Sequence, residues 1–487
     1  MSISEVIRIH GRLRPDKDAI VERGRRISFR SLDRRLDGFC AAMAMLGIGR
    51  GDAVAVALGD TSEHLIALLG LARLGAVIVP IDHRWNTAEQ QSVAKSFGAR
   101  RILIEPQRPE AQPPWIRVEP AWFREHDRAY FDPEIGPDTP LVLSLSSGTT
   151  GAPKGPCANH RQYENRFMVY WLNLGFSSYE RYVSATPLYF GGGRGFAWAI
   201  LFAGATVFLY PPPFEPGDLV AFVRDKDATA MFLVPTLARR ILDLDLDGLA
   251  FPGMRCLISS GSALFADERR AIKARLTPNL YEMYSSSEGG AVSVLAPADL
   301  DTHPDSVGRP CFRVQVEVVD EDHCPVPRGE TGRLRYHSPA SPTSYFGGEV
   351  NAEAFRDGWY YPGDLAAITD DGFVYLRGRA KDMIIRGGVN IYPGDIEQVL
   401  MRSGKIKEVA VVGIPSRELG EEVAAFVVAA ATTDETELAA ACKAQLASYK
   451  VPKHFVFLAE LPRNNGGKVI KAELAGMLSD APPIGSR

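Results

Sequence analysis

The chain has 487 residues, enough for about two to four packed domains, and 46% of them are hydrophobic. Lys and Arg total 55 against 59 for Asp and Glu, so the net charge of −4 lacks the basic surplus typical of nucleic-acid binding. Charged residues make up 23%, which excludes disorder as a description of the whole chain.

The six cysteines include no C-x-x-C pair, which disfavours structural zinc and a disulfide framework and makes a reducing cytoplasm the expected location. The N-terminal residues, MSISEVIRIHGRLRPDKD, carry charges where a signal peptide needs an apolar core. Residues 65–81 form the most apolar stretch, but Arg73 interrupts it, whereas a membrane span needs about 20 apolar residues. We therefore expect no membrane association.

Apolar residues alternate between helical and strand-like spacing along the first 260 residues. Helices are predicted at 33–46, 63–74 and 219–226, and strands at 52–58, 76–81, 230–234 and 255–258. Short apolar strands that alternate with helices predict the α/β class, with parallel-rich sheets packed against crossover helices.

The pattern then changes twice. From Val314 onward, turn-rich strand signals in VQVEVVDEDHCPVPRGETGRLRY predict a β-rich subdomain. Beyond Gly378 a new pattern begins, with helices expected at 396–403 and 437–449 and strands at 409–414 and 422–430. We predict a large N-terminal domain over residues 1–380 and a small C-terminal α+β domain over residues 381–487.

A dense run of small and hydroxyl-bearing residues, SLSSGTTGAPKG at 144–155, follows a strand-like segment. Its glycines let the backbone turn tightly toward a ligand, and its hydroxyls and Lys154 add donors and a positive charge, which suits a polyphosphate. It is not a Walker loop, because glycine follows Lys154. A Gly/Ser linker is the alternative, but linkers rarely place Pro-Lys-Gly directly behind an apolar strand.

This run closely resembles the signature of the adenylate-forming superfamily, which includes acyl-CoA synthetases, firefly luciferase and nonribosomal adenylation domains. Four further motifs follow in the family's order: YSSSE at 284–288, GWYYPGDL at 358–365, GRAKDMIIRGGVNIYPGDIE at 378–397 and LPRNNGGKVIK at 461–471. The resemblance spans the whole chain. It implies an acid–CoA ligase that uses ATP, Mg²⁺ and coenzyme A, forms an acyl-adenylate with release of pyrophosphate, and passes the acyl group to the CoA thiol.

The resemblance also implies a nucleotide site. Its residues are Ser146, Ser147, Gly148, Thr149, Thr150, Lys154, Ser262, Ala263, Glu282, Met283, Tyr284, Ser287, Asp364, Arg379 and Lys468. Tyr284 is expected to stack on adenine, and Asp364 to accept hydrogen bonds from the ribose hydroxyls. Glu288 is a hard oxygen ligand suited to Mg²⁺, with help from Ser146.

Lys468 is the expected catalytic residue, because an ammonium between the attacking carboxylate and the α-phosphate orients both groups and offsets the charge of the transition state. Lys381 occupies the family's hinge position. The resemblance implies that the C-terminal domain is mobile, delivering Lys468 in one pose and presenting Gly387 and Gly388 to the thiol in the other. Glycines there let a pantetheine arm pass close to the backbone.

The implied acyl pocket comprises Tyr189, Phe190, Gly191, Gly192, Ser260, Gly261 and Gly289. Glycines at 191–193, 289 and 290 remove side-chain volume, so we expect an aromatic or a medium- to long-chain acid as substrate. Arg166 and Arg194 are either solvated at the surface or paired with a second carboxylate on the substrate.

The sequence departs from the family at three places. Phe190 stands where histidine is common, Ser285 and Ser287 replace the usual glycine and threonine, and Pro213 stands where many CoA-using relatives carry Lys or Arg. The last departure keeps open an enzyme that passes the acyl group to a carrier-protein pantetheine or an amine. A non-catalytic adenylate-binding regulator is the alternative from another class, and formation of a homodimer stays open.

Overall fold

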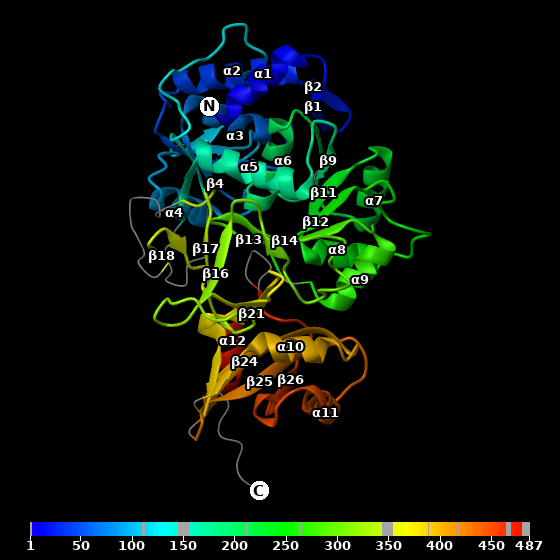
Figure 1. The fold of residues 1–487 in the computed structure, drawn as a ribbon. Helices are drawn as coiled ribbons and strands as arrows, with labels where there is room; N and C mark the ends of the chain where they lie inside the picture. Colours follow the sequence, from blue (N-terminus) through cyan, green and yellow to red (C-terminus); the bar gives the residue numbers. More distant parts are fainter. Residues whose placement is uncertain are drawn as a thin grey trace.

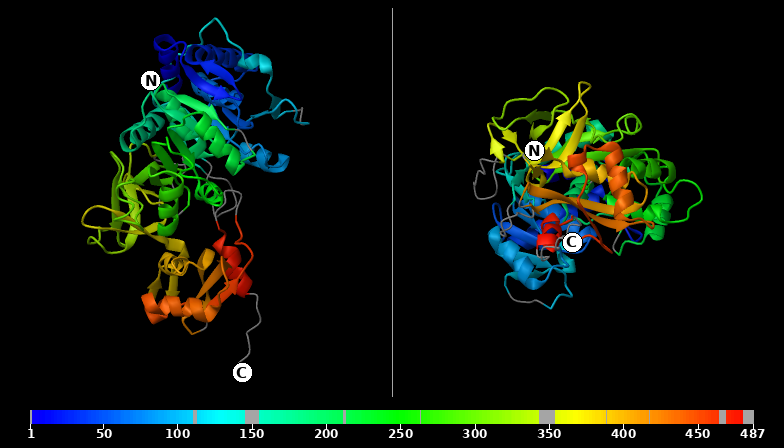
Figure 2. Two further views of the ribbon diagram at one scale, coloured as in Figure 1. Left: turned by 90° about the vertical axis from the view of Figure 1, so that its right-hand side faces the viewer. Right: turned by 90° about the horizontal axis from the view of Figure 1, so that it is seen from below.

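The computed structural model describes residues 2–109, 113–144, 155–210, 213–262, 264–342, 354–387, 389–416, 418–463 and 469–479. A large N-terminal part carries a small C-terminal part at one end, and the C-terminal part stands apart from the rest in the two side views (Figure 1 and the left panel of Figure 2). This arrangement confirms the predicted α/β class with a large and a small domain.

The first sheet of the N-terminal part runs in the order β6-β5-β3-β4-β7-β8, with parallel pairing except between β7 and β8. Its strands are β3 (Ala53–Ala57), β4 (Val77–Pro80), β5 (Arg101–Ile104), β6 (Trp115–Arg117), β7 (Pro140–Leu143) and β8 (Cys157–Asn159). The accompanying helices are α1 (Ile3–Leu13), α2 (Phe29–Met45), α3 (Ser62–Leu74), α4 (Thr87–Ser96) and the short η1 (Pro120–Phe123).

The second sheet is larger and runs in the order β15-β14-β13-β12-β11-β9-β10-β1-β2. Its strands are β1 (Asp18–Glu22), β2 (Arg25–Ser28), β9 (Arg181–Ser184), β10 (Thr206–Leu209), β11 (Ala230–Leu233), β12 (Cys256–Ser259), β13 (Leu280–Ser286), β14 (Gly290–Leu295) and β15 (Arg309–Pro310). Its helices are α5 (His160–Leu174), α6 (Gly191–Phe202), α7 (Pro216–Asp225), α8 (Pro235–Leu242) and α9 (Ala266–Arg275). From β13 to β1 the neighbouring strands are parallel.

Three apolar clusters define the layers. One lies between the two sheets and contains buried residues of α3, α5 and α6, such as Leu65, Phe167 and Ile200. A second covers the other face of the large sheet with α7, α8 and α9, and a third covers the other face of the first sheet with α4. Helices therefore bury both faces of each parallel-rich sheet, which explains why its strands are continuous apolar runs.

The β-rich subdomain begins where the sequence predicts it. Its strands are β16 (Gln315–Val319), β17 (Gly332–His337), β18 (Phe355–Arg356), β19 (Trp359–Tyr360), β20 (Asp364–Ile368) and β21 (Val374–Arg379). They form an antiparallel sheet in the order β18-β19-β17-β20-β21, with β16 on β17.

The C-terminal part has its own sheet, in the order β23-β22-β25-β24 with β26 on β25. Its elements are η2 (Ala380–Asp382), β22 (Ile384–Arg386), β23 (Val389–Ile391), α10 (Pro393–Met401), β24 (Ile406–Ser416), β25 (Gly420–Ala429), α11 (Glu435–Gln445), η3 (Ser448–Lys450), β26 (His454–Phe457) and α12 (Lys471–Ser479). The chain passes from one sheet to the other between Arg379 and Ile384, and the predicted boundary at 380/381 falls in this link.

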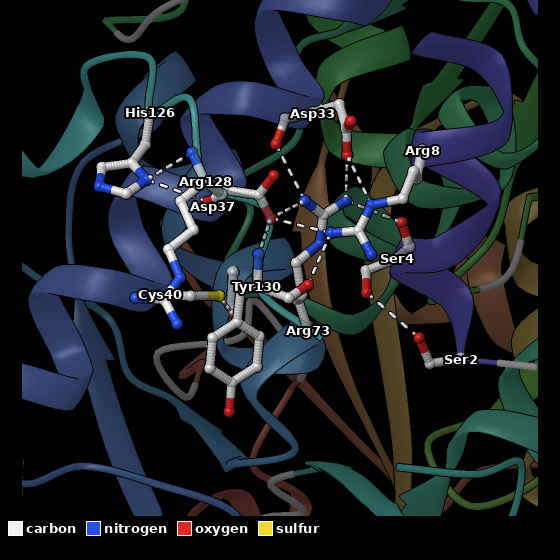
Figure 3. Close-up of polar contacts among 11 residues, drawn as sticks. Ser2, Ser4, Arg8, Asp33, Asp37, Cys40, Arg73, His126, Arg128 and Tyr130 are labelled. Atoms are coloured by element: carbon white, nitrogen blue, oxygen red, sulfur yellow. Dashed lines mark hydrogen bonds and ion pairs between the residues drawn. The ribbon is translucent and has the colours of Figure 1, made fainter. Parts of the chain in front are cut away.

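Arg73 interrupts the apolar helix α3 because it ties three helices together. Its guanidinium donates to Asp33 Oδ1 at 2.7 Å and to Asp37 Oδ1 at 2.8 Å on α2, and to the Ser4 carbonyl at 3.2 Å on α1. Arg8 also pairs with Asp37 at 2.9 Å, and the groups converge in one cluster (Figure 3). No described helix is long and apolar enough to cross a membrane.

Candidate active site

The predicted adenine- and ribose-binding residues meet at the junction of the large sheet and the β-rich subdomain. Tyr284, on β13, donates its hydroxyl hydrogen to Asp364 Oδ2 on β20, and Arg379 Nε on β21 lies 2.9 Å from Asp364 Oδ1. Asp364 and Arg379 are partners in the strand register, so the backbone itself sets this pair side by side. Burial and the neighbouring Asp364 carboxylate raise the pKa of Tyr284 well above its usual value, so the phenol stays neutral and can donate.

Serine side chains shape the turn that follows Tyr284. Ser285, which replaces the family's glycine, lies 3.0 Å from Ser260 at the end of β12. Ser286 lies 2.5 Å from the Tyr336 hydroxyl and accepts a hydrogen bond from the Gly289 amide at 2.9 Å. The turn is therefore tied to β12 on one side and to the β-rich subdomain on the other.

Glu288 lies in this turn and is nearly buried. The residue is 7% exposed, and in the described part of the chain no hydrogen bond or ion pair engages its carboxylate. A nearly buried acid without a partner is costly unless a cation or donor joins it. A hard oxygen donor in this setting fits Mg²⁺, which keeps several waters and binds through few carboxylates. No group of three or more metal-ligating side chains occurs among the described residues.

Other predicted nucleotide-site residues contribute differently. The Glu282 carboxylate is bound to Arg269 Nε at 2.5 Å, and both residues are buried, so this acid is engaged within the protein. The Met283 side chain packs into the apolar core at 5% exposure. Only the backbones of these two residues are left to face a ligand, whereas Ser262 is exposed.

The segment around Tyr189 is held by the first sheet and its loops. The Leu188 amide donates to Asp60 Oδ1 at 2.6 Å, and Arg84, itself paired with Asp82, donates to the Tyr189 hydroxyl at 2.9 Å. Phe190, which replaces the family's histidine, is 39% exposed beside this anchored segment. The predicted pocket wall is thus fixed by residues that are distant in sequence.

The glycines expected to enlarge the pocket mostly accommodate the protein itself. A methyl group added at Gly289 would lie 2.2 Å from the Tyr336 hydroxyl, and at Gly192 it would lie 2.7 Å from the Phe232 ring. At Gly193 it would meet the Pro187 carbonyl, and at Gly290 the Arg166 side chain. Only Gly191 of the five has no atom within 4 Å, so inferring pocket volume from the other four glycines was wrong.

Arg166 and Arg194 are not solvated at the surface. They are 7% and 1% exposed, and the interpretation of both as surface residues was therefore wrong. Arg166 donates to the Glu288 carbonyl at 2.5 Å, and Arg194 donates to the Tyr189 carbonyl at 2.9 Å.

The predicted hinge lies between two lightly connected parts. Lys381 is exposed in η2, and Gly387 has its amide bound to the Leu419 carbonyl at 2.7 Å. Across the two parts, Arg402 pairs with Asp305 at 2.5 Å, and Arg377 Nη1 lies 3.7 Å from Asp395. Partly exposed ion pairs of this kind are weak, so these two pairs contribute little to holding the parts together.

Several predicted residues lie outside the described residues: Ser146, Ser147, Gly148, Thr149, Thr150, Lys154, Ala263, Gly388 and Lys468. Conversely, the motifs did not point to Tyr336, Arg269 or Asp60, which support the site from other strands, helices and loops. No local pattern marks these residues, because each acts through a contact made in three dimensions.

Comparisons with known proteins agree with this geometry. The family model described as AMP-binding enzyme matches residues 8–346, and that of the AMP-binding enzyme C-terminal domain matches residues 395–468. An indoleacetate–CoA ligase of Aromatoleum aromaticum is 31% identical over 98% of this chain and 98% of its own length. A feruloyl-CoA synthase of Amycolatopsis sp is 31% identical over 95% of this chain and 96% of its own length.

A solved structure shares the fold. The o-succinylbenzoate CoA synthetase from Bacillus subtilis, in complex with the acyl-adenylate intermediate OSB-AMP, has a TM-score of 0.87 at 25% identity and covers 98% of both chains. These matches confirm the resemblance carried by the five motifs and the predicted enzyme class, an AMP-forming acid–thiol ligase.

Proposed function

The chain belongs to the AMP-binding enzyme family, and on that premise we propose that it joins an aromatic or elongated carboxylic acid to coenzyme A in two steps. In the first, a carboxylate oxygen attacks the α-phosphorus of ATP and pyrophosphate leaves. In the second, the CoA thiolate sulfur attacks the acyl carbon and AMP leaves. The observation that carries the proposal is the junction of Tyr284, Asp364 and Arg379, next to Glu288, whose carboxylate has no partner among the described residues.

Each of these residues has a role that its chemistry supports. The Asp364 carboxylate accepts from Tyr284 and pairs with Arg379 at this junction, and we assign to it the ribose hydroxyls, which are hydrogen-bond donors. Glu288, together with Ser146, would hold Mg²⁺, which offsets phosphate charge. Lys468 would bridge the attacking carboxylate and the α-phosphate, where a fixed ammonium stabilises the transition state. Lys381 would be the hinge between the two steps.

Further observations bear on which acid is the substrate and which molecule accepts the acyl group. Two relatives are named for aryl-substituted acids, indoleacetate and ferulate, so an aromatic acid leads the candidates. The departure at Pro213 does not leave the region without a cation, because the exposed Arg240 guanidinium lies 5.1 Å from the ring centre of the adjacent Phe214. A guanidinium there suits a CoA phosphate and favours CoA over a carrier protein or an amine. Since CoA and ATP are cytoplasmic, we place the enzyme in the cytoplasm, where its six free cysteines stay reduced.

The decisive experiment measures pyrophosphate release across a panel of acids, with and without CoA. The panel runs from acetate through hexanoate and decanoate to benzoate, phenylacetate, indoleacetate and ferulate, with Lys468→Ala as the control. Turnover that requires acid and rises with CoA is expected. A slow release that ignores CoA would redirect the search to carrier proteins and amines. Absence of pyrophosphate release with every acid, despite ATP binding, would favour a non-catalytic regulator.

A further inference from the structure

Two arginines without a carboxylate partner are buried at the predicted acyl pocket. Arg166 on α5 and Arg194 on α6 are 7% and 1% exposed. Among the described residues, no carboxylate oxygen lies within 4.0 Å of either guanidinium, unlike buried Arg73, which pairs with Asp33 and Asp37. Arginine stays charged in proteins, so these two positive charges are buried without a carboxylate in direct contact among the described residues.

Among the described residues, the two guanidiniums donate hydrogen bonds only to neutral groups. Arg166 donates to the carbonyls of Ser287, Glu288 and Ala340, and Arg194 donates to those of Leu188 and Tyr189. The guanidinium carbon of Arg166 lies over the Tyr163 ring, 5.0 Å from its centre, and that of Arg194 lies over the Trp198 ring, 5.9 Å from its centre.

Carbonyl groups and aromatic ring faces compensate only in part for the hydration that a buried cation loses, so burial of a charge without a counter-ion has a high free-energy cost.

Tyr163 joins the two arginines. Its ring packs edge-on against Trp198 at 5.4 Å between centroids, and the residue is 2% exposed. Burial raises the pKa of the Tyr163 phenol, but the Arg194 and Arg166 guanidiniums outweigh that effect and hold it below its ordinary value. The surroundings of the phenol oxygen therefore favour negative charge, as an anion-binding site does.

The cluster also contains two N–H donors without an acceptor among the described residues. Arg194 Nε and Trp198 Nε1 are buried and have no hydrogen-bond partner in the described part of the chain. Most buried donors in folded proteins are satisfied, so two orphaned N–H groups on neighbouring residues of α6 call for a missing acceptor. A carboxylate supplies two acceptor oxygens and the missing charge together.

The two arginines contact segments of the predicted acyl site. Arg166 holds the turn that carries Glu288, and Arg194 holds the Tyr189 segment, so each arginine braces one of these segments. Gly290 permits this arrangement, because a methyl group there would come within 3.1 Å of the Arg166 side chain.

We propose that the acyl substrate carries a second carboxylate, distant from the one that is activated, and that this group pairs with Arg194 and Arg166 beside Tyr163. The substrate class is then a dicarboxylic acid, aromatic or elongated. This inference rests on the proposed acid activation and narrows it. Arg194 is the main specificity residue, since it is the more deeply buried and retains an unused donor.

The test compares acids that differ only in the distant carboxylate. Adipate is paired with hexanoate, and 3-(2-carboxyphenyl)propanoate with 3-phenylpropanoate, and kcat/KM is measured by pyrophosphate release. We expect the diacid of at least one pair to be favoured about tenfold or more, the usual range for a hydrogen-bonded charge pair. Arg194→Met should lower kcat/KM for that diacid about tenfold more than for its monoacid, and Arg194→Lys should restore part of the preference.

Matched controls separate the outcomes. Arg161→Met changes an exposed arginine of the same helix α5, 55% exposed, and should leave the diacid preference intact. Equal or better use of both monoacids by the unaltered enzyme would overturn the inference while leaving acid activation standing. An equal loss for both acids in Arg194→Met would also overturn it, because that is the pattern of a structural residue. Absence of pyrophosphate release with every acid would contradict the proposed function itself.

Discussion

Replacement of Arg73 by methionine tests whether the buried ion-pair cluster stabilises the N-terminal domain. The Arg73 side chain is 4% exposed and makes hydrogen bonds of 2.7–3.2 Å to Asp33, Asp37 and Ser4. Removing one partner of a buried pair costs about 3–5 kcal/mol, because the remaining charge stays desolvated. Asp37 keeps Arg8 at 2.9 Å and the Tyr130 amide at 3.1 Å, so we expect the lower end, about 3 kcal/mol.

Urea unfolding followed by tryptophan fluorescence measures this loss. The matched control is Arg161→Met, whose partner Asp138 is 70% exposed and whose ion pair should leave the unfolding midpoint unchanged. Arg73→Lys keeps the charge but not the planar fork, so its midpoint should fall between those of the methionine variant and the unaltered protein. A midpoint for Arg73→Met equal to that of the control would refute the reasoning.

Three further outcomes follow from the site. Glu288→Gln should raise the Mg²⁺ concentration that half-saturates pyrophosphate release by about tenfold, since the amide lacks the charge that the cation requires, and an unchanged Mg²⁺ dependence would count against the assignment. Lys381→Pro should slow transfer to CoA more than adenylate formation, measured separately by quenched flow, and equal losses would contradict a hinge. Gly289→Ala should abolish activity, because its methyl group would collide with the Tyr336 hydroxyl, whereas Gly217→Ala, with open space around it, should retain activity.

Much of the fold follows from local sequence patterns. The helix predicted at 63–74 is α3 (Ser62–Leu74), which Thr61 caps at its start by accepting from the His64 amide and which Gly75 ends with a φ of 72°. Such signals act within a few residues, so they can be read directly from the chain. The pairing of Asp364 with Arg379 follows from motif recognition, and the strand register then places both at one point.

The sequence by itself determined the family, the reaction class and the chain positions of several apolar strands, and its motifs predict which residues face the nucleotide. The tertiary structure alone decided which charges are buried and what each glycine accommodates. From the sequence, Arg166 and Arg194 were expected either at the surface or paired with the substrate, and the structure buries both residues, on α5 and α6. Burial and charge pairing arise from contacts between segments far apart in the chain, and no local periodicity records them.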